Sequence, residues 1–183
     1  MVDTPLVARS SAERVGLIFG RHGETARQWD WPMLVGEWGA YGHHPATLLA
    51  ARDVVRLFEQ LRCGDTYWAF EEKLPDAPCF RAVQRPYPER VPGQLDSYHY
   101  DPQTGVFECA WSEDPAVEAP AVIYLPGWLD STRVELLPSA DGFQRERRDR
   151  HPGGSWLVVP TTGRAGQRLL RVIGRGEGGQ ARR

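Results

Sequence analysis

The chain has 183 residues, 41% of them hydrophobic, and a formal net charge of -2, a composition typical of one ordinary globular domain or two small ones. The weak net charge gives no electrostatic reason to expect nucleic acid or an anionic membrane as a partner. With 15 prolines and 19 glycines, the sequence favours many turns over a helical bundle.

Helical and strand-like patterns alternate through residues 1–74. Residues 11–29 have helical spacing interrupted by glycines, and residues 46–62 have the apolar stripe of an amphipathic helix. Residues 33–35 form a short apolar run typical of a parallel strand buried on both faces. Residues 65–70 are rich in aromatic side chains and predict a second strand. The order helix, strand, helix, strand indicates an α/β layer fold.

The pattern changes after Leu74. Residues 75–93 are rich in proline and predict a linker, and residues 174–183 predict a disordered tail. Short strands separated by turns predict an antiparallel β-sandwich over residues 94–173. The expected strands are 95–100, 106–111, 121–125, 132–137, 155–159 and 168–173.

The cysteines and the apolar runs limit the class of protein further. Cys63, Cys79 and Cys109 are widely spaced and odd in number, so we expect reduced thiols rather than a disulfide framework or a zinc site. No apolar run approaches the roughly 20 residues that span a bilayer. Residues 1–14 lack the basic-then-apolar layout of a signal peptide, so a cytoplasmic location is the default expectation.

Glu37 is the sharpest candidate for chemistry. It follows the apolar run within Leu34–Gly39 (LVGEWG), which places a carboxylate at the C-terminal end of a predicted parallel strand. The α/β barrels build their active sites at that end. The glycines of the motif permit close approach of backbone and substrate, and Trp38 offers an apolar wall. Trp68, near the end of the next strand, offers an indole face on which a sugar ring can stack.

The residues 33–42 (MLVGEWGAYG), a helix, and then 65–70 (DTYWAF) resemble strand seven, helix seven and strand eight of glycoside hydrolase family 5. In that family the nucleophilic glutamate follows strand seven in a G-E-[FW]-G context, and a tryptophan closes strand eight. The resemblance implies that Glu37 is the nucleophile and that Trp38 and Trp68 shape the sugar site.

The resemblance extends collinearly over residues 13–173. From Arg85-Pro86-Tyr87-Pro88 onward, the sequence is similar to the C-terminal β-sandwich of endoglycoceramidase-like members of the family. We therefore expect an α/β remnant of a TIM (β/α)8 barrel followed by an antiparallel β-sandwich. The implied reaction is retaining hydrolysis of O-glycosyl compounds, without a metal or an organic cofactor.

One part of the family pattern has no counterpart here. A retaining glycosidase needs two carboxyl groups about 5–5.5 Å apart. The family takes its acid/base glutamate from an Asn-Glu pair after strand four, and this sequence contains no asparagine. A barrel of eight units takes about 250 residues, whereas residues 1–74 can supply two strands. We therefore expect an inactive or incomplete fragment whose partners are a carbohydrate or glycolipid substrate and a missing N-terminal barrel portion or second chain.

Other residues of the chain permit weaker interpretations. His43 and Glu71 lie in loops where contact with a substrate is feasible, although exposed loop residues of this kind are usually bystanders. Arg21–Thr25 (RHGET) copies the signature of histidine phosphatases, in which His22 would be the phosphoryl-accepting nucleophile. A third alternative is a non-catalytic carbohydrate- or lipid-binding sandwich, for which Trp128 is the best exposed candidate. In that sandwich Trp111 and Trp156 are expected in the core.

Overall fold

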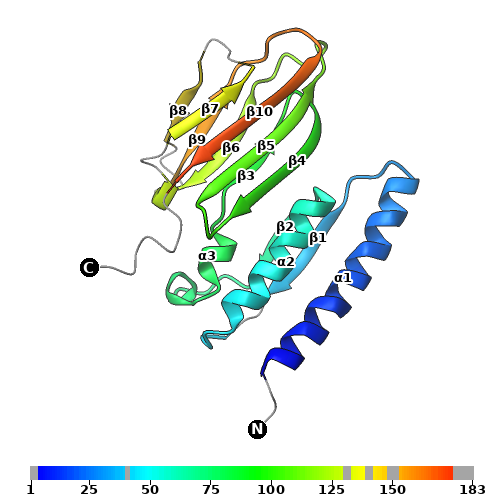
Figure 1. Ribbon diagram of the computed structural model, residues 1–183, viewed down its shortest axis with the longest axis vertical. Helices are drawn as coiled ribbons and strands as arrows, with labels where there is room; N and C mark the ends of the chain where they lie inside the picture. The colour runs from blue at the N-terminus through cyan, green and yellow to red at the C-terminus, as the bar shows by residue number, and fades with distance from the viewer. Residues whose placement is uncertain (1–3, 40–41, 130–132, 139–141, 148–152, 175–183) are drawn as a thin grey trace. The chain divides into compact units, whose positions relative to one another are not determined.

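The computed structural model describes residues 4–39, 42–129, 133–138, 142–147 and 153–174, with side chains from residue 13 onward. The chain divides into two compact units, Met1–Gln84 and Arg85–Arg183. The first contains helices and a pair of parallel strands, and the second contains two antiparallel sheets (Figure 1). Among the described residues, no helix is both long enough and apolar enough to cross a bilayer.

The first unit confirms the expected order of helix, strand, helix and strand. The two strands pair in parallel, and the second helix connects them, so they form a β-α-β unit. Its elements are α1 (Thr4–Gln28), β1 (Leu34–Gly39), α2 (Thr47–Leu61) and β2 (Gly64–Trp68).

The core of the first unit lies along helix α2. Its predicted apolar stripe is confirmed, because Ala51, Val55 and Phe58 are buried. Phe19 of α1 meets Phe58 edge to face, with ring centroids 5.5 Å apart. Gly23 permits the close approach of α1, since a Cβ at that position would lie 2.4 Å from a Leu61 methyl group.

The end of α2 differs from the sequence expectation. The predicted stripe reached residue 62, but the helix ends at Leu61, and Arg62 takes the left-handed conformation with a φ of 53°. The amide of Cys63 donates to the carbonyl oxygen of Phe58 at 3.2 Å, which satisfies one of the last helical carbonyls. Gly64 begins β2, and its amide donates to the carbonyl oxygen of Met33 at 3.1 Å.

The proline-rich segment expected as a linker is structured on both sides of the unit boundary. Its first half contains η1 (Leu74–Asp76) and α3 (Phe80–Val83), whose buried residues join the core of the first unit. Its second half contains β3 (Tyr87–Arg90), which pairs with the sandwich strand β6. Pro88 is tolerated there because β3 is an edge strand.

The second unit is a sandwich of two four-stranded sheets, ordered β4-β5-β10-β7 and β3-β6-β9-β8. All six expected strands are present, and β3 and β8 are additional short ones. Their bounds are β4 (Gly93–Asp101), β5 (Val106–Glu113), β6 (Ala121–Pro126), β7 (Arg133–Leu137), β8 (Gln144–Glu146), β9 (Gly154–Val159) and β10 (Gly166–Ile173), with η2 (Gly127–Leu129) after β6.

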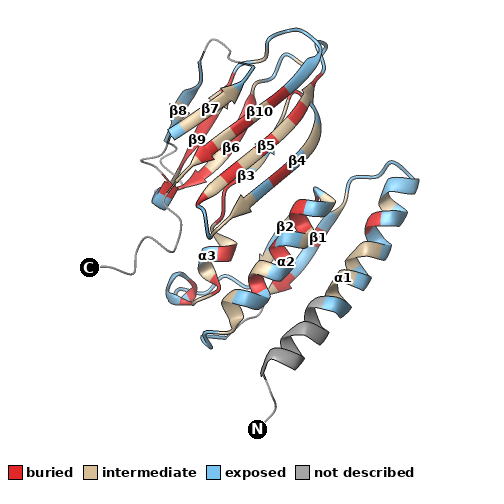
Figure 2. Ribbon diagram, in the orientation of Figure 1, coloured by how far each residue is buried: buried red, intermediate tan, exposed pale blue. Residues whose placement is uncertain are grey.

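The inner faces of the two sheets enclose one apolar core. Buried and less buried residues alternate along β5, as Figure 2 shows. Phe107, Cys109 and Trp111 are the buried ones, which confirms the core position predicted for Trp111. Residues 175–183, most of the expected disordered tail, lie outside the described residues. From the facing sheet the core receives Ile123, Leu125, Leu157 and Val159.

Candidate active site

Glu37 lies within a strand rather than in the loop that the sequence predicted. The apolar run was expected to end at Val35, but β1 continues to Gly39. The strand continues because β2 supplies backbone partners as far as Trp68, which lies opposite Gly39. The carboxylate is therefore carried by a paired strand, close to its C-terminal end.

Strand β1 bulges at Gly36 and Glu37. These two residues together stand opposite Thr66 alone, so β1 has one more residue than β2 at this point. The Thr66 hydroxyl donates a hydrogen bond to the carbonyl oxygen of Gly36, which ties the bulge to the neighbouring strand. On either side the strands are in regular register, Val35 with Asp65 and Trp38 with Tyr67.

The bulge determines which face of the sheet carries the carboxylate. Residues alternate between faces in a regular strand, but here both Gly36 and Glu37 are exposed. On β2, Thr66 and Trp68 are exposed as well. We call the side formed by Gly36, Glu37, Thr66 and Trp68 the open face. The opposite face carries Val35 and Trp38 into the core beside α2.

Trp38 has a different place from the one expected for a wall of the sugar site. Its side chain is only 7% exposed and meets the rings of Phe58 and Tyr67 edge to face, each with centroids 5.2 Å apart. The indole nitrogen donates to Oδ2 of Asp65 at 2.8 Å. Trp38 therefore fixes β1 against α2 and β2, and its ring offers no free stacking surface.

Trp68 lies where the sequence placed it, at the end of β2. Its side chain is 57% exposed on the open face. The neighbouring Gly39 has a φ of +117°, and a Cβ there would lie 2.4 Å from the Tyr67 ring. Glycine is thus required at the end of β1, in agreement with the close backbone approach predicted for this motif.

His43 and Glu71 are both exposed, in the segments that follow β1 and β2. In the described part of the chain, neither side chain makes a hydrogen bond or ion pair with Glu37. The neighbouring His44 has a structural role, because its carbonyl oxygen and Nδ1 accept hydrogen bonds from Thr47 and Ala46 at the start of α2. Within the described ranges, no group of three or more His, Cys, Asp or Glu residues is placed to hold a metal ion.

The histidine phosphatase alternative loses its structural basis. Arg21–Thr25 lies inside helix α1, where His22 is exposed on the surface. The Thr25 hydroxyl donates to the carbonyl oxygen of Arg21 at 3.1 Å, one turn back along the helix. In the described part of the chain, no strand precedes α1, so His22 does not lie at the end of a strand.

The tryptophans of the second unit lie as the sequence predicted. Trp111 and Trp156 are buried, and the indole nitrogen of Trp156 donates to Oε2 of Glu89 at 2.9 Å. Trp128 is 37% exposed and packs against Tyr100, with ring centroids 5.3 Å apart.

Residues 85–165 match the family model of the glycoside hydrolase family 5 C-terminal domain. The match begins at the first residue of the second unit and ends directly before β10. The sandwich unit therefore resembles the C-terminal domain of glycoside hydrolase family 5. This finding confirms the resemblance to family 5 that the sequence indicated. No curated protein matches the chain.

Solved structures share the fold. Endo-glycoceramidase II from Rhodococcus sp., solved as its lactosyl-enzyme intermediate, has a TM-score of 0.63 and 24% identity, covering 86% of this chain and 37% of that one. The structure of its ganglioside GM3 complex has a TM-score of 0.62 and 24% identity, covering 84% of this chain and 34% of that one. Sterylglucosidase 1 from Cryptococcus neoformans has a TM-score of 0.61 and 14% identity, covering 92% of this chain and 33% of that one.

These likenesses reach well beyond the sandwich, because a match over 86% of the chain includes much of the first unit. The chain spans about a third of the length of the solved proteins that it resembles.

The feature that sequence reasoning missed is the bulge under Glu37. A signal for it was present in Gly36, because an isolated glycine inside a strand often marks a bulge. Gly36 was instead interpreted as a residue that permits close approach of backbone and substrate, and a loop was expected from Glu37 to His44.

Proposed function

We propose that this chain is the C-terminal part of a retaining glycosidase of family 5, in which Glu37 is the nucleophile. The observation that carries the proposal is the bulge in β1. It holds an exposed carboxylate near the C-terminal ends of two parallel strands, on the same face as the exposed indole of Trp68. Active sites of (β/α)8 barrels are built at those strand ends.

The proposal assigns the first unit to the last two strands of such a barrel. In that fold the helices form an outer ring, so the face of the sheet away from the helices is the inner one. Here α2 packs against the side of Val35 and Trp38, which makes the open face with Glu37 the inner side. In the described part of the chain, β1 and β2 pair only with each other, so both outer edges remain for further strands.

In the proposed reaction, the Glu37 carboxylate attacks the anomeric carbon and forms a glycosyl ester. The departing oxygen receives a proton from a second carboxyl group, and that group then removes a proton from the water that hydrolyses the ester. We assign the second carboxyl to the remaining barrel portion. Trp68 would stack on a sugar ring, and His43 and Glu71 would border the site from the adjoining loops.

We propose the substrate class from the names and complexes of the solved enzymes. The Rhodococcus enzyme has been solved with a lactosyl group covalently attached and in complex with a ganglioside, and the Cryptococcus enzyme is a sterylglucosidase. We infer an O-glycoside with a lipid or carbohydrate aglycone as the substrate of the complete enzyme. The partner that completes it is an N-terminal barrel portion, on the same or a second chain.

The test combines this chain with the N-terminal barrel portion of the Rhodococcus enzyme, as a fusion and as separate chains. We expect the 183 residues alone to release neither the aryl alcohol from an aryl β-glucoside nor sugar from a glycolipid. After complementation we expect measurable release of these products. Glu37→Gln should abolish that release, whereas Glu72→Gln, a matched change in the loop after β2, should preserve it. Release by the chain alone, or complemented release that survives Glu37→Gln, would contradict the proposal.

A further inference from the structure

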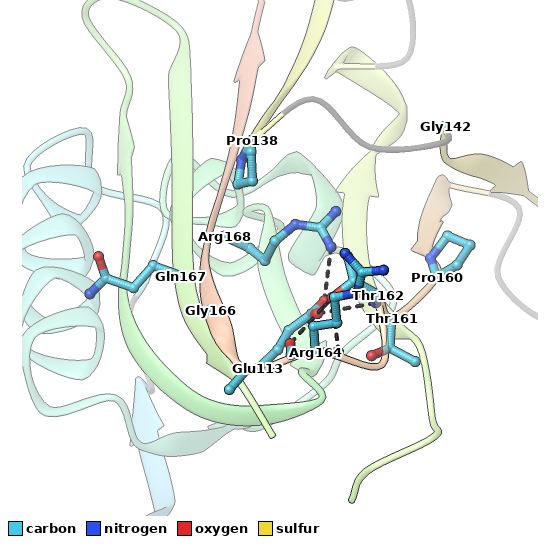
Figure 3. A pocket seen from close by; sticks show the side chains of 11 residues that line it. Glu113, Pro138, Gly142, Pro160, Thr161, Thr162, Arg164, Gly166, Gln167 and Arg168 are labelled. Carbon is cyan, nitrogen blue, oxygen red and sulfur yellow. Dashed lines mark hydrogen bonds and ion pairs between the residues drawn. The ribbon is translucent and has the colours of Figure 1, made fainter. Parts of the chain in front are cut away.

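The second unit contains a pocket at the point where β5 ends and β10 begins. Its volume is about 550 Å³, which is within the range of small-molecule sites. All of its lining residues belong to the sandwich unit (Figure 3). Its polar lining comes from Glu113, Thr161, Thr162, Arg164, Gln167 and Arg168.

A buried ion pair forms one wall of this pocket. Nη1 of Arg168 lies 2.9 Å from Oε1 of Glu113, and the two side chains are only 2% and 1% exposed. The other carboxylate oxygen of Glu113 accepts hydrogen bonds from the amide of Thr162, at 3.1 Å, and from its hydroxyl. Both oxygens of Glu113 are therefore engaged, and the pair fixes the segment that leads into β10.

Arg168 retains donors that its partner does not use. Its Nε and Nη2 atoms are buried and find no acceptor among the described residues. The guanidinium lies over the Trp111 ring, with Cζ 5.8 Å from the ring centroid. This cation–π contact uses one face of the guanidinium and gives its in-plane N–H groups no acceptor. Buried polar groups of native proteins nearly always have partners, so these donors indicate an acceptor that the described residues do not supply.

The charges around the pocket indicate the chemistry of that acceptor. Arg164 lines the same pocket, and Figure 3 shows its guanidinium turned toward the space beside that of Arg168. Among the described lining residues, two guanidinium groups and one carboxylate leave an excess of one positive charge. Because guanidinium groups only donate hydrogen bonds, and their fork matches carboxylate and phosphate oxygens, the complementary ligand is an oxyanion.

We propose that this pocket binds a sugar-sized molecule that carries a carboxylate or a phosphate. The anionic oxygens accept hydrogen bonds from the unused donors of Arg168 and from Arg164. The remaining volume exceeds what a bare ion needs, and Thr161 and Gln167 line it as partners for hydroxyl groups. This inference does not depend on the proposed glycosidase function.

The test is a titration of the full 183-residue chain with glucuronate, glucose 6-phosphate, glucose and inorganic phosphate. We expect saturable binding of one or both sugar acids by calorimetry, together with a shift of the Arg168 Nε–H signal in nuclear magnetic resonance spectra. Glucose should cause neither. Stronger binding of glucuronate or of glucose 6-phosphate distinguishes a carboxylate from a phosphate ligand.

Two arginine variants provide the matched comparison. Arg164→Gln should weaken binding by roughly ten-fold or more, the effect of one lost charge-assisted hydrogen bond. Arg171→Gln changes an arginine of the same strand as Arg168 that is paired with Glu108 at 2.6 Å, and it should leave binding unchanged. Circular dichroism checks that both variants fold.

Three results would overturn the proposal. The first is that neither sugar acid binds saturably. The second is an equal loss of affinity in both arginine variants, which would indicate diffuse surface attraction. The third is binding of inorganic phosphate as tight as that of the sugar acids, which would reduce the pocket to a site for an adventitious ion only.

Discussion

Adjacent residues in this chain have opposite environments, and their chemistry follows from that difference. Glu37 is exposed on the open face of β1, whereas Trp38 is buried and hydrogen-bonded to Asp65. In the sandwich, Cys109 is fully buried on the inner face of β5. Burial, with a smaller effect from the negative charge of Asp96, raises the pKa of the Cys109 thiol to about 12.

This shift predicts a loss of stability at high pH. Between an ordinary thiol pKa near 8.5 and the raised value, the unfolded chain has lost the Cys109 proton while the folded chain retains it. The unfolded state then binds fewer protons, so the free energy of unfolding falls as pH rises, by up to about 1.4 kcal/mol per pH unit from this group. The difference in urea stability between the natural chain and Cys109→Ala should therefore shrink from pH 8 to pH 11. A difference that is constant over this range would contradict the assignment.

At the scale of elements, the sheet around Glu113 shows how backbone space constrains the sequence. Gly93 at the start of β4 and Gly166 at the start of β10 both pair with Glu113, one on each side of β5. Gly93 has a φ of +127°, and a Cβ there would lie 2.3 Å from the carbonyl oxygen of Ser112. Around Gly166 there is no heavy atom within 4 Å of such a Cβ among the described residues.

These two glycines give a matched prediction. Gly93→Ala should lower the free energy of unfolding by about 2 kcal/mol or more, because it combines backbone strain with a clash against fixed backbone. Gly166→Ala should change it by no more than about 0.5 kcal/mol. Urea unfolding followed by tryptophan fluorescence measures both changes. Equal effects of the two substitutions would show that the space around Gly93 is not limiting.

The elements also show what the sequence can and cannot predict. Helix α2 and the six main sandwich strands were predictable, because apolar spacing alone determines which of their residues are buried. Strand β3 was hidden by its proline, which is acceptable only because the strand lies at an edge. Gly36 alone could not predict the bulge, because the bulge depends on the register between β1 and β2, which lie 25 or more residues apart. The burial of Trp38 follows from that register as well.

At the scale of the whole chain, the two units differ in how much apolar surface they cover. The sandwich encloses its core between two sheets. The first unit leaves large apolar side chains exposed on α1 and around the parallel strand pair, and uncovered strand edges and apolar patches promote association. The exposed side chains are Leu17 (67%), Ile18 (55%), Leu34 (67%), Trp68 (57%) and Phe70 (77%).

We therefore expect the isolated 183-residue chain to self-associate as its concentration rises. A shorter chain of residues 85–174, which contains the sandwich alone, should remain folded and monomeric. Sedimentation velocity at several concentrations, with circular dichroism for folding, measures both. A monomeric full chain would show that the exposed surface of the first unit is tolerated in water. An unfolded shorter chain would show that the sandwich needs the first unit.

The parallel pairing of β1 and β2 has a geometric consequence for any partner. Among the described residues, each strand has one outer edge without a partner strand. The two edges are not interchangeable, because each presents the amides and carbonyls of a different strand, and the two strands run in the same direction. A polypeptide that covers only one of them leaves the other bare. If the first unit belongs to a barrel, as proposed, the remaining strands have to close both seams, and a partner that covers only one seam should give little protection.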